Sequence, residues 1–494
     1  MSLGKKVFSS AILLFIRKLW GNAINLVVMA FLARILAKED FGLLAVSSVF
    51  LGIISTLATS GISEYVIYYS GGDKKQKINA AFWLNLFLTI GIVLVVVVLG
   101  PLWADFFKND KIYPLMLLLL VSFFFEMLLS IPKALLRQEL EYQTLVLYGS
   151  VAMTIVSVGK LGAAYFGMGV FSLALPQAFV SPILMVAFFL KSKWRPLMYF
   201  GMSHYGQIIK YTQHLIGSRV LTKFVNEGDN IIVGKFIGLE GLGLYTLAFQ
   251  LANLVTSNVI FIINDIGLPV LSKVKSEMGL IKSVYLKMTS VLCMISFPII
   301  TALVIGSNGI ILVFYGPKWI DAVLPFQILC LFGLSRTINS PTSSLFNVMG
   351  RPDLVFKFGL IFAPLFLFSV YVGSYVGLIG VALATTITRV LGSFVLIGLA
   401  IKLIETRWSE IWNKLKFILF TSLATLIVFG MIFHFFAWSG FVWLELFAVP
   451  LAVYVNLLFY RIIFPKHFFA FIDSVLTEMT GLKNIRVLKY VFFS

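Results

Sequence analysis

The chain has 494 residues, of which 60% are hydrophobic and only 12% are charged, and its mean hydropathy is +0.99. Soluble chains carry roughly 25% charged residues, so this composition excludes an ordinary soluble protein and leaves no room for a soluble catalytic domain. The net charge of +18 is not gathered into a basic stripe with interleaved aromatic residues outside the membrane, which argues against a nucleic-acid partner. We therefore predict an all-α integral membrane protein in contact with membrane lipids.

Apolar segments long enough to cross a bilayer follow one another along the whole chain, and we count about fourteen of them. We predict spans over 12–36, 42–69, 78–103, 112–136, 144–166, 168–190, 211–237, 242–269, 283–307, 322–346, 355–376, 378–403, 416–436 and 441–463.

Lysine and arginine residues mark one side of these spans. They lie before the first span and after the second, sixth and eighth, as Lys5 and Lys6, Lys74 to Lys77, Lys191 to Arg195, and Lys273 to Lys282. The turns at 167–169, 377–380 and 438–440 are uncharged. Because short cytoplasmic loops carry the excess of basic residues, we expect both termini in the cytoplasm.

The chain contains a duplication at a fixed offset of 201 residues. It pairs Lys18 with Arg219, Asn25 with Asn226, Arg34 with Lys235, Gly42 with Gly243, and Glu64 with Asp265. Later landmarks, Pro132 with Pro341 and Tyr165 with Tyr375, extend it with slightly larger offsets. Six spans return the chain to its starting side, so the two repeats are parallel and related by an axis along the membrane normal. We predict a first lobe at 1–195, a second lobe at 196–405, appended spans 13 and 14 at 406–464, and a tail at 465–494 lying on the cytoplasmic leaflet.

Short motifs at equivalent places in the two halves resemble one family of exporters. They are Leu32-Ala33-Arg34-Ile35-Leu36 and Glu39-Asp40-Phe41-Gly42-Leu43 in the first half, and Asp229-Asn230, Gly234-Lys235, Gly238, Leu242-Gly243-Leu244-Tyr245 and Pro269 in the second. The chain resembles the polysaccharide-transporter branch, the Wzx-type flippases, of the multidrug/oligosaccharidyl-lipid/polysaccharide exporter superfamily. This resemblance covers spans 1 to 12.

The resemblance implies a V-shaped pair of six-helix lobes. It also implies that the protein moves an undecaprenyl-diphosphate-linked oligosaccharide, the repeat unit of an O-antigen, capsule or exopolysaccharide, from the inner to the outer leaflet of a bacterial inner membrane by alternating access. A polysaccharide polymerase and chain-length machinery are the expected partners. The count of fourteen spans also resembles the lipid II flippase MurJ, so architecture leaves the head group open.

Ionisable side chains inside the spans are few and costly, so they are the candidates for function. Arg219, Lys223 and Asn226 share one helical face, as do Lys18, Asn22 and Asn25. We predict a cationic substrate cavity lined by Arg17, Lys18, Asn22, Asn25, Arg219, Lys223, Asn226, Arg336 and Arg389. Arginine forks and lysine charges suit a diphosphate.

Each candidate also has a simpler interpretation. Arg17 and Lys18 lie near enough to the cytoplasmic end to snorkel, and the other cations can pair internally with Glu227 or Asp229. Asp229 either braces its helix through a basic partner or carries a proton. The paired acids Glu64 and Asp265 either gate the inner opening by meeting basic residues of the opposite lobe or lie solvated at the interface.

Three other classes of function compete with a flippase. A drug or cation antiporter is expected to favour acids over bases in its cavity. A polymerase, ligase or glycosyltransferase needs catalytic residues on larger outward loops, and no paired carboxylates or catalytic triad stands out, so we predict that the protein is not an enzyme. A scaffold does not need a repeated charged stripe. We expect no cofactor and no metal, because there is no phosphate loop and the two cysteines and four histidines form no ligand cluster.

Overall fold

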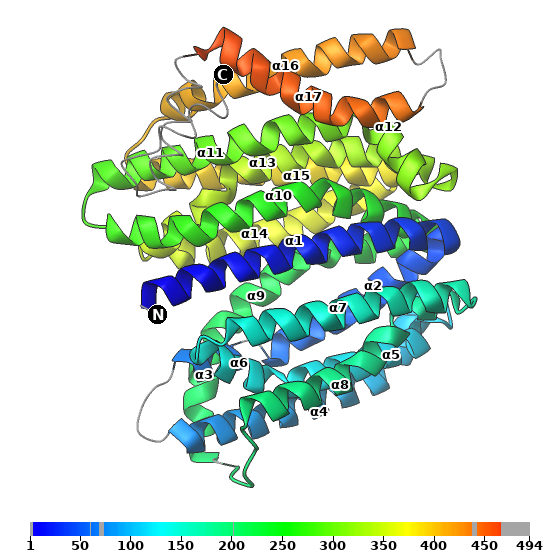
Figure 1. Ribbon diagram of the computed structural model, residues 1–494, viewed down its shortest axis with the longest axis vertical. Coiled ribbons are helices and arrows are strands. Elements are labelled where there is room, and N and C mark those ends of the chain that lie inside the picture. Colours follow the sequence, from blue (N-terminus) through cyan, green and yellow to red (C-terminus); the bar gives the residue numbers. More distant parts are fainter. Residues whose placement is uncertain (1–2, 60, 69–73, 201, 437–441, 466–494) are drawn as a thin grey trace. The chain divides into compact units, whose positions relative to one another are not determined.

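The computed structural model describes residues 3–59, 61–68, 74–200, 202–436 and 442–465, and every regular element within these ranges is helical (Figure 1). The helices are α1 (Leu3–Ile35), α2 (Lys38–Thr59), α3 (Ile62–Tyr68), α4 (Lys74–Phe107), α5 (Ile112–Leu128), α6 (Ser130–Gln138), α7 (Tyr142–Tyr165), η1 (Gly169–Leu173), α8 (Leu175–Ser192), α9 (Met202–Phe236), α10 (Leu239–Lys273), α11 (Met278–Ile305), α12 (Ser307–Ile310), η2 (Ile311–Tyr315), η3 (Pro317–Ala322), α13 (Val323–Val348), α14 (Pro352–Ser374), α15 (Gly377–Leu403), α16 (Trp408–Phe436) and α17 (Val442–Ile463).

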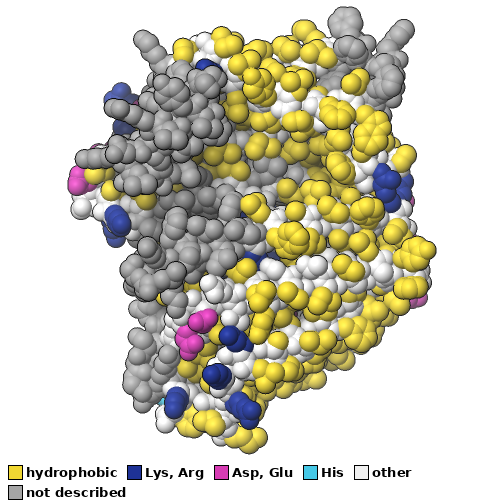
Figure 2. All heavy atoms as spheres, viewed as in Figure 1, with side chains coloured by type: hydrophobic (Ala, Val, Ile, Leu, Met, Phe, Trp, Pro, Cys, Tyr) yellow, Lys and Arg dark blue, Asp and Glu magenta, His cyan; other side chains and the backbone are white. Residues whose placement is uncertain are grey.

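Twelve stretches of helix among the described residues are long and apolar enough to cross a membrane. Helices suit this setting because they satisfy every backbone polar group internally. Leu94, Val98 and Leu102 lie one turn apart on α4 and are all about two-thirds exposed. They form an apolar stripe on the surface, which is suited to contact with lipid. Hydrophobic side chains likewise predominate on much of the face drawn in Figure 2. These observations confirm an all-α membrane fold.

The count of fourteen spans stays a prediction, because α9 and α10 are not among the twelve. Both helices have 35 residues and are long enough to cross. The charged residues that interrupt the apolar pattern of α9 include Arg219, Lys223, Glu227 and Asp229.

Two predicted spans are each divided between two helices. The span expected over 42–69 breaks between α2 and α3, where Gly61 adopts a left-handed backbone (φ +98°) that only glycine takes without strain. The span expected over 112–136 breaks at Leu129, between α5 and α6. The short helix α6 buries Ile131, Ala134 and Leu136.

The described helices form two compact units. The first comprises Met1–Ala248, Phe314–Ala322 and Phe356–Thr385. Within it α1 packs on α7, α4 and α8 pack on α5, and α2 packs on α9. A core that includes Tyr65, Phe82 and Ile131 joins α3, α4 and α6. This packing gathers one face of α1 with α5 to α8.

The second unit comprises Phe249–Val313, Val323–Val355 and Thr386–Ser494. Helix α11 is its centre and packs on α13, α16 and α17. The appended hairpin α16–α17 is pinned by a buried hydrogen bond of 3.1 Å from Asn456 to Ser422. Both cysteines, Cys293 and Cys330, are buried and free, as small core residues are. These units follow packing contacts, so the repeat boundaries at 195 and 405 stay a prediction. The tail at 465–494 lies almost entirely outside the described residues.

A cationic cavity in the first compact unit

A cavity of about 540 Å³ lies within the first unit, between α1 and the helices α5 to α8. Its lining residues are Arg17, Asn25, Glu126, Lys133, Arg137, Tyr142, Leu145, Gly149, Ala152, Met153, Val156, Ser157, Lys160, Gln177, Val180, Ser181, Leu184 and Phe188. One helix alone does not build this site. Each of the five contributes one face, and the charged residues come from four of them.

The charge of the cavity is strongly unbalanced. Arg17, Lys133, Arg137 and Lys160 line it against the single carboxylate of Glu126. Among the residues that the structure describes, no carboxylate forms an ion pair with any of these four cations. Unneutralised cations at membrane depth are costly unless a ligand or water compensates them. The cavity is therefore suited to an anion.

Neighbouring side chains hold the charged groups in place. The Lys133 ammonium lies 5.5 Å from the centre of the Phe188 ring, a cation–π distance. Glu126 accepts a hydrogen bond of 3.2 Å from the Gln177 amide. The guanidinium of Arg17 occupies the space beside Gly149, because a Cβ added at Gly149 would lie less than 3.0 Å from it. Gly149 thus lets Arg17 lie flat against α7.

Two of the nine predicted cavity residues, Arg17 and Asn25, line this cavity. Lys18 and Asn22 lie on α1, both half-buried, but are not part of its lining. Asn226 is exposed on α9. The predicted stripe on α1 therefore divides, and only part of it faces the cavity.

Arg219 and Lys223 on α9 form ion pairs. Arg219 lies 2.9 Å from Glu64 on α3, and Lys223 lies 2.5 Å from Glu227, one turn along the same helix. Burial by itself raises the pKa of the Glu64 carboxyl, but the hydrogen bond and the charge from Arg219 outweigh it and lower that pKa below its usual value. Glu64 therefore meets a basic residue of the second repeat.

Arg336 and Arg389 lie in the second unit, and both contact α10. Arg336 donates a hydrogen bond of 2.6 Å to the side chain of Asn253. Arg389 is buried, with its guanidinium 5.6 Å and 4.9 Å from the ring centres of Phe249 and Phe332. Arg336 on α13 and Arg389 on α15 therefore form a second cationic cluster, separate from the cavity lining.

Asp229 is buried in the first unit and bonded to Tyr245. Its carboxylate accepts a hydrogen bond of 2.8 Å from the Tyr245 hydroxyl, which lies 3.1 Å from the Thr385 hydroxyl. This environment suits a brace between α9, α10 and α15. The other predicted acid, Asp265, lies on α10, and its side chain is outside the described residues.

Comparison with known proteins decides the family. A family profile described as "Polysaccharide biosynthesis protein" matches residues 31–324, more than half of the chain. The chain belongs to the polysaccharide biosynthesis protein family. It is 25% identical over 441 residues to the lipopolysaccharide biosynthesis protein WzxC of Escherichia coli (strain K12), covering 87% of this chain and 88% of WzxC. It is 27% identical over 286 residues to the teichuronic acid biosynthesis protein TuaB of Bacillus subtilis (strain 168), covering 57% and 59% of the two chains.

Solved structures share the fold of this family member. The lipid II flippase MurJ, in an inward closed conformation, superposes with a TM-score of 0.73 at 16% identity, over 93% of this chain and 99% of MurJ. A multidrug resistance MATE family transporter of the MOP superfamily, in an inward-facing conformation, superposes with a TM-score of 0.62 at 15% identity, over 78% of this chain and 94% of that transporter. The fold and family inferred from the sequence motifs are confirmed.

Sequence reasoning missed three of the four cavity cations, namely Lys133, Arg137 and Lys160. The signal was present for two of them, because Lys133 and Lys160 fall inside predicted apolar spans. In the second repeat the duplication landmarks Pro341 and Tyr375 place Thr342 opposite Lys133 and Val370 opposite Lys160. Both are buried, and Thr342 is bonded to Tyr285 at 3.0 Å. The cationic cavity is thus a property of the first repeat.

Proposed function

We propose that the protein is a flippase that carries an undecaprenyl-diphosphate-linked oligosaccharide from the inner to the outer leaflet of a bacterial cytoplasmic membrane. The observation that carries the proposal is the cavity in which four cations face one carboxylate. The names of WzxC, a lipopolysaccharide biosynthesis protein, and TuaB, a teichuronic acid biosynthesis protein, support a glycan precursor as substrate. A cavity rich in bases is unsuited to a cationic substrate.

The chemistry of the lining fits a diphosphate joined to sugars. Arg17 and Arg137 offer planar donors for two phosphate oxygens each, while Lys133 and Lys160 supply mobile point charges. Asn25, Gln177, Tyr142 and two serines provide amide and hydroxyl groups suited to sugar hydroxyls. A volume of about 540 Å³ lies in the usual range for small-ligand sites and has room for the diphosphate with its first sugars. The polyprenyl tail then stays in lipid.

The remaining parts of the proposal concern topology and coupling. Both termini are placed in the cytoplasm, from the distribution of lysine and arginine. Transport proceeds by alternating access, without a covalent change in the substrate, and a gradient or consumption of the product outside supplies the direction. A polymerase and chain-length proteins receive the flipped repeat unit. The cations Arg219, Lys223, Arg336 and Arg389 stay proposed as later contacts along the path.

A reconstituted assay tests the function. Purified protein in proteoliposomes is given a fluorescent undecaprenyl-diphosphate disaccharide, and its arrival in the far leaflet is followed by quenching with an impermeant reductant. We expect flipping with this lipid and at least tenfold less with undecaprenyl monophosphate carrying the same disaccharide. Competition by a lipid II head group tests the MurJ-like alternative. Export of a cationic dye with no flipping of either lipid would overturn the proposal in favour of an antiporter.

A further inference from the structure

Two glycines that the duplication pairs bring α2 and α10 into backbone contact. A Cβ added at Gly42 would lie less than 3.0 Å from the carbonyl oxygen of Leu239, and one added at Gly243 would lie equally close to that of Lys38. Leu239 and Lys38 are the first residues of the helices that carry the opposite glycine. Neither glycine has a positive φ, so each is needed for close approach and not for a turn.

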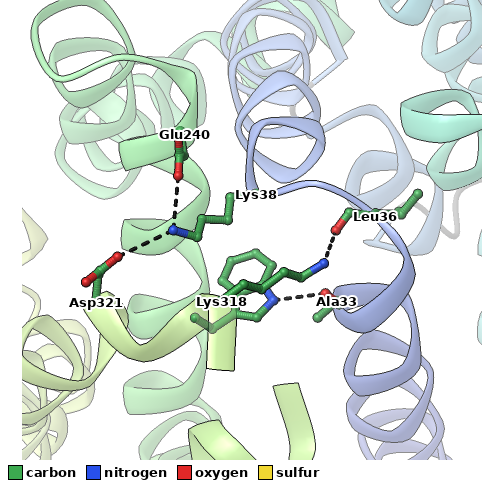
Figure 3. A network of polar contacts seen from close by, with 7 residues as sticks. Ala33, Leu36, Lys38, Glu240, Lys318 and Asp321 are labelled. Carbon is green, nitrogen blue, oxygen red and sulfur yellow. Dashed lines mark hydrogen bonds and ion pairs between the residues drawn. The ribbon is translucent and has the colours of Figure 1, made fainter. Parts of the chain in front are cut away.

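The same residues begin a polar network between the two repeats (Figure 3). The Lys38 ammonium lies 3.0 Å from Glu240 at the start of α10 and 3.4 Å from Asp321 in η3. Lys318 donates to the carbonyl oxygen of Leu36 at 2.5 Å, and the buried Trp319 indole donates to that of Ala33 at 2.9 Å. Side chains of η3 thereby satisfy carbonyl groups that the end of α1 leaves unbonded.

A second pair of duplicated residues makes matching contacts. Arg34, at the end of α1, donates to the carbonyl oxygen of Phe314 at 3.2 Å. Its counterpart Lys235, at the end of α9, donates to the carbonyl oxygen of Phe106 and lies 4.1 Å from the centre of that ring. Phe106 and Phe314 are 208 residues apart, close to the offset of the later landmarks. In each repeat, therefore, a basic side chain at the end of the first helix donates a hydrogen bond to a phenylalanine carbonyl group of the other repeat.

We propose that these contacts form a duplicated outer latch, comprising Arg34, Lys38, Gly42, Lys235, Glu240, Gly243 and Asp321, which closes the outer side and must separate for substrate to leave. The inference rests on the proposed function and its topology, which place the turns after α1, α4 and α9 and the segment at η3 on the outer side. All these contacts lie within the first compact unit.

The chemistry of the latch suits a contact that forms and breaks. Glu240 and Asp321 are about two-thirds exposed, so water competes with their ion pairs and each pair is individually weak. The glycine contacts are backbone against backbone and depend on shape, and beside them one buried aromatic pair, Phe41 and Trp319, packs edge to face at 5.2 Å. A permanent core, such as that around Tyr285 and Phe297, is instead apolar and closed to water. Polar, small-residue contacts are typical of parts that move against each other.

Alanine at the two glycines tests the latch by shape alone. Gly42→Ala and Gly243→Ala favour the helix in each case, since alanine is the better helix former, but their Cβ atoms forbid the closed contact. The reporter is Ala33→Cys, buried in this structure, in a chain whose two native cysteines are alanine. We expect an impermeant thiol reagent outside intact cells to label it at least fivefold faster in either variant. Gly91→Ala is the matched control, because that helical glycine has no neighbour within 4 Å.

A charge variant decides the question if an alanine variant fails to reach the membrane. Lys38→Gln removes both ion pairs without adding volume, and we expect it to raise labelling at least twofold. An unchanged rate in every inserted variant would overturn the latch. The labelling needs no substrate, so it is independent of the transport assay. Normal latch opening with no lipid flipping would count against the proposed function alone, and flipping with an unresponsive latch would count against the latch alone.

Discussion

The guanidinium of Arg219 on α9 lies 2.9 Å from the carboxylate of Glu64 on α3. The pair joins a helix of the first repeat to the first helix of the second. The sequence interpretation left Arg219 between substrate binding and internal pairing, and left Glu64 between a gate and a solvated end. The structure brings the two residues together, which favours a joint role. Both side chains are more than 40% exposed, so the pair is held weakly.

Neutralising Glu64 tests that role. Exposed ion pairs contribute about 0.2–1 kcal/mol, so Glu64→Gln should leave protein level unchanged and raise the labelling of a cysteine at Thr222 from the cytoplasmic side by no more than about fivefold. The double swap Glu64→Arg with Arg219→Glu should restore the slower rate. Glu139→Gln, at another exposed glutamate, is the control. Equal labelling in all four proteins would leave Glu64 as a solvated residue.

The lowered pKa of Glu64 determines the pH below which this ion pair is lost. Because the folded-state pKa lies below the usual value, the stabilisation is fully present above the ordinary carboxyl range of about 4–4.5 and is lost as pH falls through the lowered value. Labelling at Thr222→Cys should therefore be flat between about pH 6 and 8 and rise only below about pH 4. In Glu64→Gln this acid-dependent rise should disappear. A change in wild-type labelling near neutral pH would point to another titrating group.

Replacing Lys160 should change stability and ligand binding in different ways. It has no carboxylate partner among the described residues, and methionine matches its length without its charge. Lys160→Met should keep or raise the thermal midpoint, because an uncompensated cation is removed from an apolar lobe. It should also weaken binding of undecaprenyl diphosphate at least tenfold, about 1.4 kcal/mol. Lys402→Met, at an exposed helix end, should change neither quantity. Unaltered binding in Lys160→Met would remove that residue from the site.

Asp229 is predicted to brace the fold. Tyr245→Phe leaves the buried carboxylate without one donor, and Asp229→Asn weakens the same bond, so each should destabilise the protein by about 1–3 kcal/mol. We expect lower thermal midpoints and lower protein levels, with transport per molecule largely retained. Thr246→Val is a control on the same helix, because that hydroxyl bonds only its own backbone turn at Gly243. Normal stability with abolished transport in Asp229→Asn would instead identify a coupling group.

The proposed topology predicts a simple labelling pattern. A cysteine at Lys75, before the apolar part of α4, should resist an impermeant reagent in intact cells, and one at Asp110, in the turn after α4, should react. Permeabilised cells should show equal labelling at both positions, which controls for local reactivity. The reverse pattern in intact cells would place the termini outside the cytoplasm.

The sequence by itself determined the membrane fold, the family and the duplication. These properties are written in local patterns: uninterrupted apolar runs longer than a bilayer, motifs such as Asp229-Asn230, and residues repeated at a fixed offset. It also identified Arg17 and Asn25, because a cation and an amide inside an apolar run stand out wherever the run packs. Lys133 and Lys160 carried the same signal, and a consistent search of every span would have found them.

Only the tertiary structure decided which polar side chains meet. The cavity needs faces of α1, α5, α6, α7 and α8, and α6 contributes Lys133 and Arg137 to it. Glu64 and Arg219 are 155 residues apart and become partners only because α3 packs beside α9. Helical periodicity gives the polar face of one helix but not the neighbour that this face meets. That choice depends on the packing of helices distant in the chain, where close approaches such as Gly42 on Leu239 decide which surfaces fit.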